Sequence, residues 1–295
     1  MRNITFAAAT LWVALLSLFT LSALAAVISL AAMPAARAAA AAGTAAGPGA
    51  AVLTEHVRAE LLTHAPQGVQ PGKPVWLGLA IEHQPHWHTY WKNPGDSGLP
   101  TTLAWTLPAG FAAGGIAWPT PQHLPLGPLL NYGYEGRVLL PVPVTVPAGF
   151  KGETLEVTLH AEWLVCKEIC LPESGDFHIA IPVAAPTTAH QALFDAARAA
   201  VPVAVPQASA SARVDGNALA MAIRGLPAAA QGQPLGLMVE DAGVIDYAAK
   251  VEQRWVDGLL TLRVPLSAQR SESPAALQII LKADRQPAGL SLIHI

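Results

Sequence analysis

The chain keeps two cysteines in 295 residues, and both lie in the segment AEWLVCKEICLPESG at 161–175. Cys166 ends an alternating stretch that predicts a β-strand, and it falls on the more polar face, at the exposed side or end of that strand. Cys170 follows after a three-residue turn, which can bring the two Cα atoms within the roughly 4.4–6.8 Å that a disulfide requires. The apolar face of this strand carries Val157, Leu159, Ala161, Trp163 and Val165.

The pair is better suited to redox chemistry than to stapling the fold. A disulfide stabilises mainly by closing a long loop in the unfolded chain, and a bridge between residues four apart closes almost none. Exported proteins do use disulfides as staples, so this alternative stays open. Lys167 is the one cation close to the pair in sequence, among Glu162, Glu168, Glu173 and Asp176. Nothing in this segment strongly stabilises a thiolate. Because strong oxidants owe their power to a stabilised reduced form, the segment favours a dithiol that gives electrons away.

A second group of side chains could bind a metal. The segment EHQPHWHTYW at 82–91 contains His83, His86 and His88. Residues two apart on a strand face the same way, so His86 and His88 could share an ion. Copper(I) favours sulfur donors, and the cysteine pair could supply two. The alternative is an aromatic-rich strand end with solvated imidazoles.

Two further motifs are interpreted as turns. The segment NPGDSGLP at 93–100 contains the Gly-Asp-Ser-Gly string of chymotrypsin-like proteases. That fold needs its histidine and aspartate well upstream of the serine, and too few residues precede Ser97 to hold them. Pro-Gly instead suits a tight turn. The segment NYGYEG at 131–136 places Tyr132 and Tyr134 in what its glycines predict to be a turn between strands.

The N-terminus has the features of an export signal. Arg2 precedes an apolar run from about Phe6 to Met33, and small residues with a plausible cleavage site, Ala36-Arg37-Ala38, close it. We therefore predict a signal peptide over 1–38, with an uncleaved membrane anchor as the alternative because about 20 apolar residues can span a bilayer. The Ala/Gly stretch at 39–51 is interpreted as a flexible spacer.

Charge and motifs exclude several functions. The net charge is −3, from 17 basic and 20 acidic residues without a basic block, which argues against nucleic acid as a partner. The phosphate-binding motifs GxGxxG and GxxxxGK[ST] are absent from the sequence. We expect no cofactor.

Periodicity after the spacer predicts an all-β protein. Short alternating or apolar stretches are separated by Gly, Pro, Asn and Asp, as in immunoglobulin-like β-sandwiches, and Pro141 and Pro143 place their stretch at a sheet edge. A helical pattern over 190–201 and the prolines after it predict a linker at 186–210. Beyond it, two Asp-Gly turns predict hairpins in a second, smaller β domain. The stretches predicted to be strands before the linker are VRAELLTH, VWLGLAIEH, RVLLPVPVTV, ETLEVTLHAEWLV and GDFHIAIPVA.

The predicted organisation is therefore two immunoglobulin-like β-sandwich domains after the signal segment. The redox-active domain covers 52–185 and the second domain 211–295. The second domain has no cysteine and no cluster of potential catalytic groups, so we interpret it as a structural or docking module.

Several motifs together resemble one family. HWHTYWKNPGDSGLPT, WPTP, YGYEG and WLVCKEICLP, in this order and spacing, are similar to the N-terminal periplasmic region of the thiol:disulfide interchange protein DsbD family. The ScsB-like branch, with two immunoglobulin-like periplasmic domains, is the most similar. The resemblance covers residues 52–185 closely and 205–290 only in architecture. The best-known members space their cysteines six apart rather than four.

The resemblance implies a protein-disulfide reductase in the periplasm. A membrane-embedded domain passes electrons through a thioredoxin-like domain to a cysteine pair, here Cys166 and Cys170. That pair reduces thioredoxin-like periplasmic proteins such as disulfide isomerases, thioredoxins of cytochrome c biogenesis or peroxiredoxins. The family shields the pair with an aromatic cap loop, for which we expect Tyr132 or Tyr134. Since the membrane and thioredoxin-like domains are missing from this chain, we expect either a fragment of a longer membrane protein or a module fed by a separate transporter.

Overall fold

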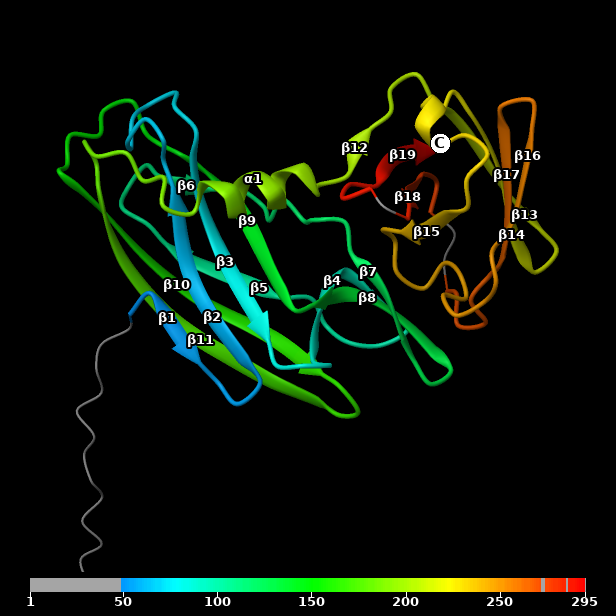
Figure 1. Cartoon of the computed structure of the whole chain (residues 1–295), viewed down its shortest axis with the longest axis horizontal. Helices are drawn as coiled ribbons and strands as arrows, with labels where there is room; N and C mark the ends of the chain where they lie inside the picture. The colour runs from blue at the N-terminus through cyan, green and yellow to red at the C-terminus, as the bar shows by residue number, and fades with distance from the viewer. Residues whose placement is uncertain (1–48, 272–273, 285, 295) are drawn as a thin grey trace, which may run out of the picture. The chain divides into compact units, whose positions relative to one another are not determined.

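A computed structural model describes residues 49–271, 274–284 and 286–294 of the chain (Figure 1). The predicted signal peptide at 1–38 and most of the predicted spacer lie outside the described residues. The first strand begins at Ala51, the last position assigned to that spacer. Among the described residues, no helix has the length and apolar character needed to cross a membrane.

Two β-sheets from residues 51–182 form the first sandwich (Figure 1). One sheet has the order β1-β2-β3-β9-β6, with β1 (Ala51–Leu53), β2 (Val57–His64), β3 (Val75–His83), β9 (Arg137–Thr145) and β6 (Ala112–Ala113). The other has the order β11-β10-β4-β8-β7 with β5 paired to β10. Its strands are β11 (Cys170–Pro182), β10 (Thr154–Cys166), β4 (His88–Gly95), β8 (Leu129–Glu135), β7 (Gln122–Leu126) and β5 (Thr102–Thr106). The all-β, immunoglobulin-like prediction is confirmed.

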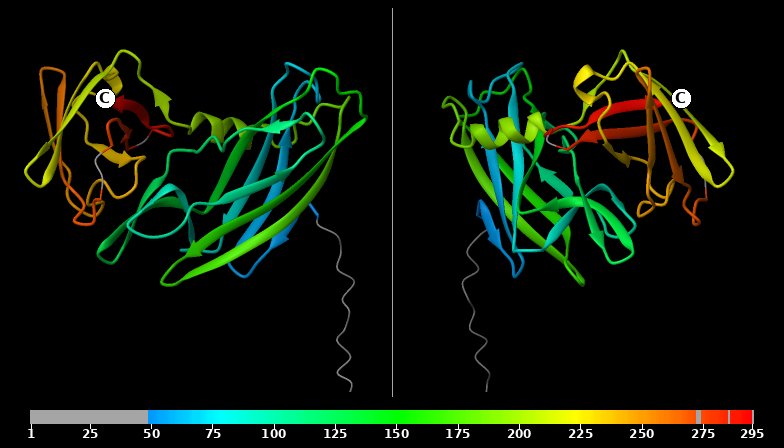
Figure 2. Two further views of the ribbon diagram at one scale, coloured as in Figure 1. Left: turned by 180° about the vertical axis from the view of Figure 1, so that it is seen from behind. Right: turned by 45° about the vertical axis from the view of Figure 1, so that its right-hand side comes forward.

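Alternation along β10 explains how the two sheets pack. The five residues assigned to its apolar face are all at most 2% exposed, and they belong to the core that also contains Leu61, Leu77, Leu79 and Ile81 of the facing sheet. Burial of such apolar side chains is the main favourable contribution to folding. The hairpin β10–β11 has 13 residues in each strand, and its connecting turn lies at the lower edge of the sandwich in each view (Figure 2).

Strand β9 shows how its prolines are tolerated. It pairs with β3 along its length, whereas on its other side only the two-residue β6 pairs with it. The prolines lack N–H donors, but their carbonyl oxygens accept bonds from Ala117 N for Pro141 and Gly114 N for Pro143, both 2.8 Å. The sequence predicts an edge strand for this stretch. In the structure β6 and the residues after it, up to Ala117, run along the side of β9 that would otherwise be the edge.

The helix predicted over 190–201 is observed as α1 (Gln191–Ala199). It packs against the first sandwich, because Phe194 is fully buried beside Gly78, Leu62 and Leu139. A side chain at Gly78 would collide with Leu139 and press on Phe194, so this glycine admits the helix. The predicted linker therefore contributes to the core of the preceding sheets.

Residues 203–294 form two four-stranded sheets. The first, β12-β19-β18-β15, contains β12 (Val203–Ala204), β19 (Leu290–His294), β18 (Leu277–Ala283) and β15 (Leu235–Val239). The second, β13-β14-β17-β16, contains β13 (Ser209–Asp215), β14 (Ala218–Arg224), β17 (Leu259–Pro265) and β16 (Glu252–Val256). Both predicted Asp-Gly hairpins are observed. At the second, Asp257 and Gly258 have φ of 47° and 73°, the positive values that a type I′ turn requires.

Candidate functional site

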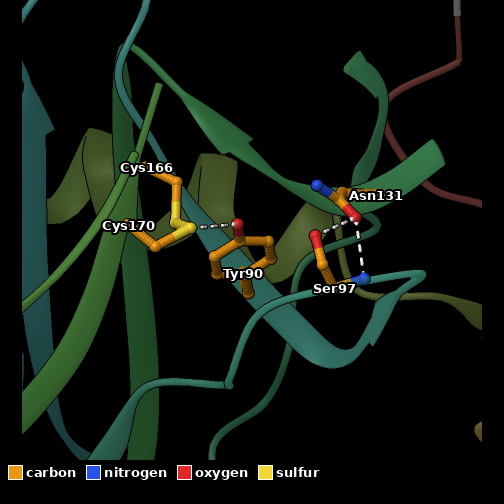
Figure 3. Close-up of a disulfide and its surroundings, with 5 residues drawn as sticks. All are labelled: Tyr90, Ser97, Asn131, Cys166 and Cys170. Atoms are coloured by element: carbon orange, nitrogen blue, oxygen red, sulfur yellow. Dashed lines mark hydrogen bonds between the residues drawn. A yellow bond between two sulfur atoms is a disulfide. The ribbon is translucent and has the colours of Figure 1, made fainter. Parts of the chain in front are cut away.

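The two cysteines form a disulfide at the tip of the longest hairpin (Figure 3). Cys166 is the last residue of β10 and Cys170 the first residue of β11, and they are directly paired across the hairpin. Their Cα atoms are 4.2 Å apart, close to the spacing of a directly opposed antiparallel pair. The predicted three-residue turn is confirmed, and within it Lys167 N donates to Ile169 O.

The two cysteines differ in exposure. Cys166 is fully buried, whereas Cys170 is exposed. Cys166 lies at the end of its strand, as one form of the expectation had it, but the expectation that it is exposed there is wrong. The reason is that β4 pairs with the end of β10, with His88 directly opposite Cys166, so a strand remote in sequence covers this position. A partner protein can thus reach the Cys170 sulfur more readily than the Cys166 sulfur.

Tyr90 covers the disulfide on this face of the sheet. Its ring is fully buried, and its hydroxyl oxygen lies 3.5 Å from Cys170 Sγ and points toward the bond (Figure 3). Burial raises the pKa of the Tyr90 phenol, against a smaller lowering by its hydrogen bond with Ser97, so the hydroxyl keeps its proton at neutral pH. Because a disulfide sulfur carries no hydrogen, the hydroxyl is the donor.

The turn after β4 holds the Tyr90 ring in place. Gly98 has a φ of +107°, and a Cβ there would lie 2.4 Å from the ring, so only glycine allows this approach. Ser97 N and Oγ both donate to Asn131 Oδ1, each at 3.1 Å (Figure 3). Asp96 accepts from Leu130 N at 2.7 Å. The Gly-Asp-Ser-Gly string is a turn, as predicted, and its serine is hydrogen-bonded to Asn131.

His88 stands between the disulfide and a carboxylate. It is paired with Cys166 on one side and with Glu135 of β8 on the other. Its side chain is 5% exposed, and its ring meets that of Tyr90 edge-on with centroids 5.1 Å apart. Burial lowers the pKa of His88, opposed in part by the charge of Glu135. The imidazole is therefore neutral near pH 7.

Comparison with known proteins identifies the region that carries this site. Residues 58–181 match the family model described as thiol:disulfide interchange protein DsbD, N-terminal. This region is a DsbD-family N-terminal domain. The structure is also similar to the crystal structure of the N-terminal periplasmic domain of ScsB from Proteus mirabilis, with a TM-score of 0.61 and 16% identity over 82% of this chain and 95% of that chain. That likeness shows a shared fold. No curated protein sequence matches the chain.

In this DsbD-family domain, the segment predicted to cap the disulfide lies elsewhere. The segment NYGYEG belongs mainly to β8, a strand between β4 and β7 rather than a turn. Gly133 is required there because a Cβ would lie 2.2 Å from Thr89 O. Tyr132 and Tyr134 belong to the core, and their hydroxyls donate to Leu237 O at 3.5 Å and Pro119 O at 2.7 Å.

The geometry of β8 explains this difference. Tyr134 is paired with Thr89, whereas Glu135 is paired with His88. Since side chains alternate between the faces of a sheet, Tyr132 and Tyr134 point away from the face that carries the disulfide. Tyr90 occupies the position that we expected one of them to fill. The sequence does contain a signal for the position of Tyr90. His88 and Tyr90 are two residues apart at the start of one strand, so their side chains share a face.

The three histidines are not arranged as metal ligands. His83 Nδ1 donates to Gly136 O at 2.7 Å and Nε2 accepts from Thr89 Oγ1 at 3.0 Å, so both of its nitrogens are used. His86 is exposed in the turn between β3 and β4, with a φ of 70°. Among the described residues, no three His, Cys, Asp or Glu side chains are grouped as a metal site would need.

Proposed function

We propose that the chain is a periplasmic thiol:disulfide interchange module that works as a disulfide reductase. The observation that carries the proposal is a disulfide in a DsbD-family domain that joins an exposed cysteine, Cys170, to a buried one, Cys166. A structural disulfide gains little from a partner-accessible sulfur, whereas exchange requires one. The redox domain would span 52–185 and the second β domain 211–295, with the helix-bearing segment 186–210 between them.

The chemistry proceeds through a mixed disulfide. In the reduced module, the Cys170 thiolate attacks the partner's disulfide, forms a bond to one partner sulfur and releases the other as a thiolate. The Cys166 sulfur then attacks Cys170 Sγ, the mixed disulfide breaks, and the second partner sulfur leaves as a thiolate. Two electrons pass to the partner, and the module returns to its disulfide form.

Partners of this reaction would be thioredoxin-like periplasmic proteins. The surface around Cys170 supports a protein partner. Ile169 is 62% exposed within the turn that joins the cysteines, and Leu99, next to the Gly98 that touches the Tyr90 ring, is 65% exposed. Burial of these two apolar side chains against a partner would be favourable. Re-reduction would come from a membrane electron-transfer domain with its thioredoxin-like domain, in the same protein or a separate one.

Incubation with a thioredoxin-like protein tests the proposal. The reduced chain is mixed with the oxidised partner, the reaction is quenched with an alkylating reagent, and free thiols are counted by mass. We expect thiols to move from the chain to the partner, and a variant with both cysteines replaced by serine to transfer none. Copper bound in stoichiometric amounts and lost from a variant with His86→Ala and His88→Ala, without any thiol transfer, would overturn the proposal.

A further inference from the structure

We propose that His88 accepts the proton of the Cys166 thiol when Cys166 attacks the mixed disulfide, and returns it when the disulfide opens. This inference rests on the proposed function, because it assigns a role within the exchange reaction.

A row of four paired residues carries the inference. Glu135, His88, Cys166 and Cys170 are directly opposite one another on the successive strands β8, β4, β10 and β11. Directly paired residues of an antiparallel sheet project from the same face, with Cβ atoms about 4.5–5.5 Å apart. A carboxylate, an imidazole and the two sulfurs therefore follow each other across one face of the sheet.

The imidazole has an unused nitrogen in the disulfide form. Nε2 of His88 is buried, and among the described residues it has no hydrogen-bond partner. The neighbouring His83 uses both of its nitrogens. An unpaired buried polar atom is unfavourable, and such an atom in a native site calls for an explanation. Reduction supplies one, because Cys166 then gains an S–H donor next to His88.

The buried position of Cys166 makes such an acceptor useful. Burial in apolar surroundings disfavours a thiolate, yet the thiolate is the nucleophile that must resolve the mixed disulfide. In the proposed step, the lone pair of His88 Nε2 takes the Cys166 proton while the sulfur bonds to Cys170 Sγ. The bond between Cys170 and the partner breaks, and its electron pair leaves on the partner sulfur.

The surroundings of His88 suit both of its charge states. The ring is neutral before the transfer because burial lowers its pKa. The imidazolium formed afterwards faces Glu135, whose carboxylate is exposed and raises the same pKa. The other titratable groups around the ring are His83, whose effect on His88 would be repulsive if charged, and Tyr90, which stays protonated. Glu135 is thus the group that favours proton uptake.

A two-step reaction with a small reagent tests the role of His88. The reduced protein is mixed, in a stopped-flow instrument, with an excess of an aromatic disulfide whose thiol product is coloured. Attack by Cys170 releases one equivalent of colour, and resolution by Cys166 releases the second. We expect His88→Gln to slow the second phase by about a hundredfold, the lower end of the range for general-base catalysis, while the first phase changes less than about twofold. Glu135→Gln, at an exposed site, should slow the second phase about two- to fivefold for the same reason.

The control is His86→Asn, in the neighbouring turn, where asparagine tolerates the positive φ; both of its phases should match the wild-type protein. A purely structural role of His88 would change both phases or neither. Two wild-type equivalents with an unchanged second phase in both His88→Gln and Glu135→Gln would overturn the role of His88 alone. Release of fewer than two equivalents by the wild-type protein would instead count against the proposed function.

Discussion

The Tyr90 hydroxyl lies 3.5 Å from Cys170 Sγ, although 80 residues separate the two in sequence. The contact places a buried aromatic residue against the sulfur that a partner would reach in the proposed reaction. An idle dithiol or disulfide in an oxidising compartment benefits from such cover, provided that the cover moves when a partner docks. The ring lies between the disulfide and Ser97 (Figure 3), and as the bulk of the side chain it is expected to supply most of this cover.

Removal of the Tyr90 ring should therefore expose the disulfide. We expect Tyr90→Ala to speed reduction by a small dithiol about tenfold, and Tyr90→Phe to stay within about twofold of the wild-type rate, because gated access depends on the ring. The measurement is the rate of thiol appearance after rapid mixing. Tyr134→Phe is the matched control, since it removes a hydroxyl from a residue on the opposite face. An alanine variant that folds and reacts no faster would refute the shielding role of Tyr90.

Replacement of Gly98 by alanine should displace the Tyr90 ring from the disulfide. The added Cβ would meet the Tyr90 ring at 2.4 Å, and alanine is strained at a φ of +107°. We expect Gly98→Ala to lower the free energy of unfolding in urea by about 2–4 kcal/mol and to speed reduction of the disulfide. Gly127→Ala is the control, because Gly127 has a φ of +56° but no atom close to its Cβ position. It should cost about 1 kcal/mol and leave the reduction rate unchanged.

Burial of His83 predicts a loss of stability in acid. Burial is the main cause that lowers its pKa to about 4 from the ordinary 6.5, so the unfolded chain binds a proton more readily between these values. The free energy of unfolding should therefore fall as the pH drops from 6.5 towards 4, with up to about 3 kcal/mol from this residue.

Urea unfolding at both pH values measures this loss. His83→Gln should reduce the pH dependence, because an amide does not titrate in this range, while the buried His88 and His123 maintain part of it. His86→Asn, at an exposed turn position, should leave the pH dependence as in the wild-type protein. A slope that is the same in His83→Gln as in the wild-type protein would contradict the assignment to His83.

Elements with a regular pattern could be predicted from the sequence. The stretches VRAELLTH and VWLGLAIEH coincide with β2 and β3, and the alternating face of β10 is the buried one. Each of these strands places apolar residues at period two or in a continuous run, so local pattern and burial agree. The disulfide-capable turn between Cys166 and Cys170 also depends only on local spacing.

Features that depend on pairing between distant strands could not be predicted. Cys166 is buried by β4, and β8 is a strand despite Asn131 and Gly133 because β4 and β7 pair with it on both sides. Sequence alone gives the period of a strand but not its neighbours or its register. The register is what places Tyr90, instead of Tyr132 or Tyr134, on the face of the disulfide. It also aligns His88 with Cys166.

Replacement of each cysteine in turn should assign the roles of the two sulfurs. Exchange passes through a mixed disulfide, so one sulfur must be reached by the partner and the other must resolve the intermediate. Cys170 is exposed and Cys166 is buried at the end of β10, which favours Cys170 as the partner-linked sulfur. Cys166→Ser mixed with a thioredoxin-like partner that lacks its own resolving cysteine should trap a covalent complex, visible on a non-reducing gel. Cys170→Ser should trap little, because its remaining thiol, Cys166, is fully buried where β4 pairs with the end of β10. Trapping by Cys170→Ser alone would reverse the two roles, and trapping by neither variant would remove the mixed-disulfide mechanism.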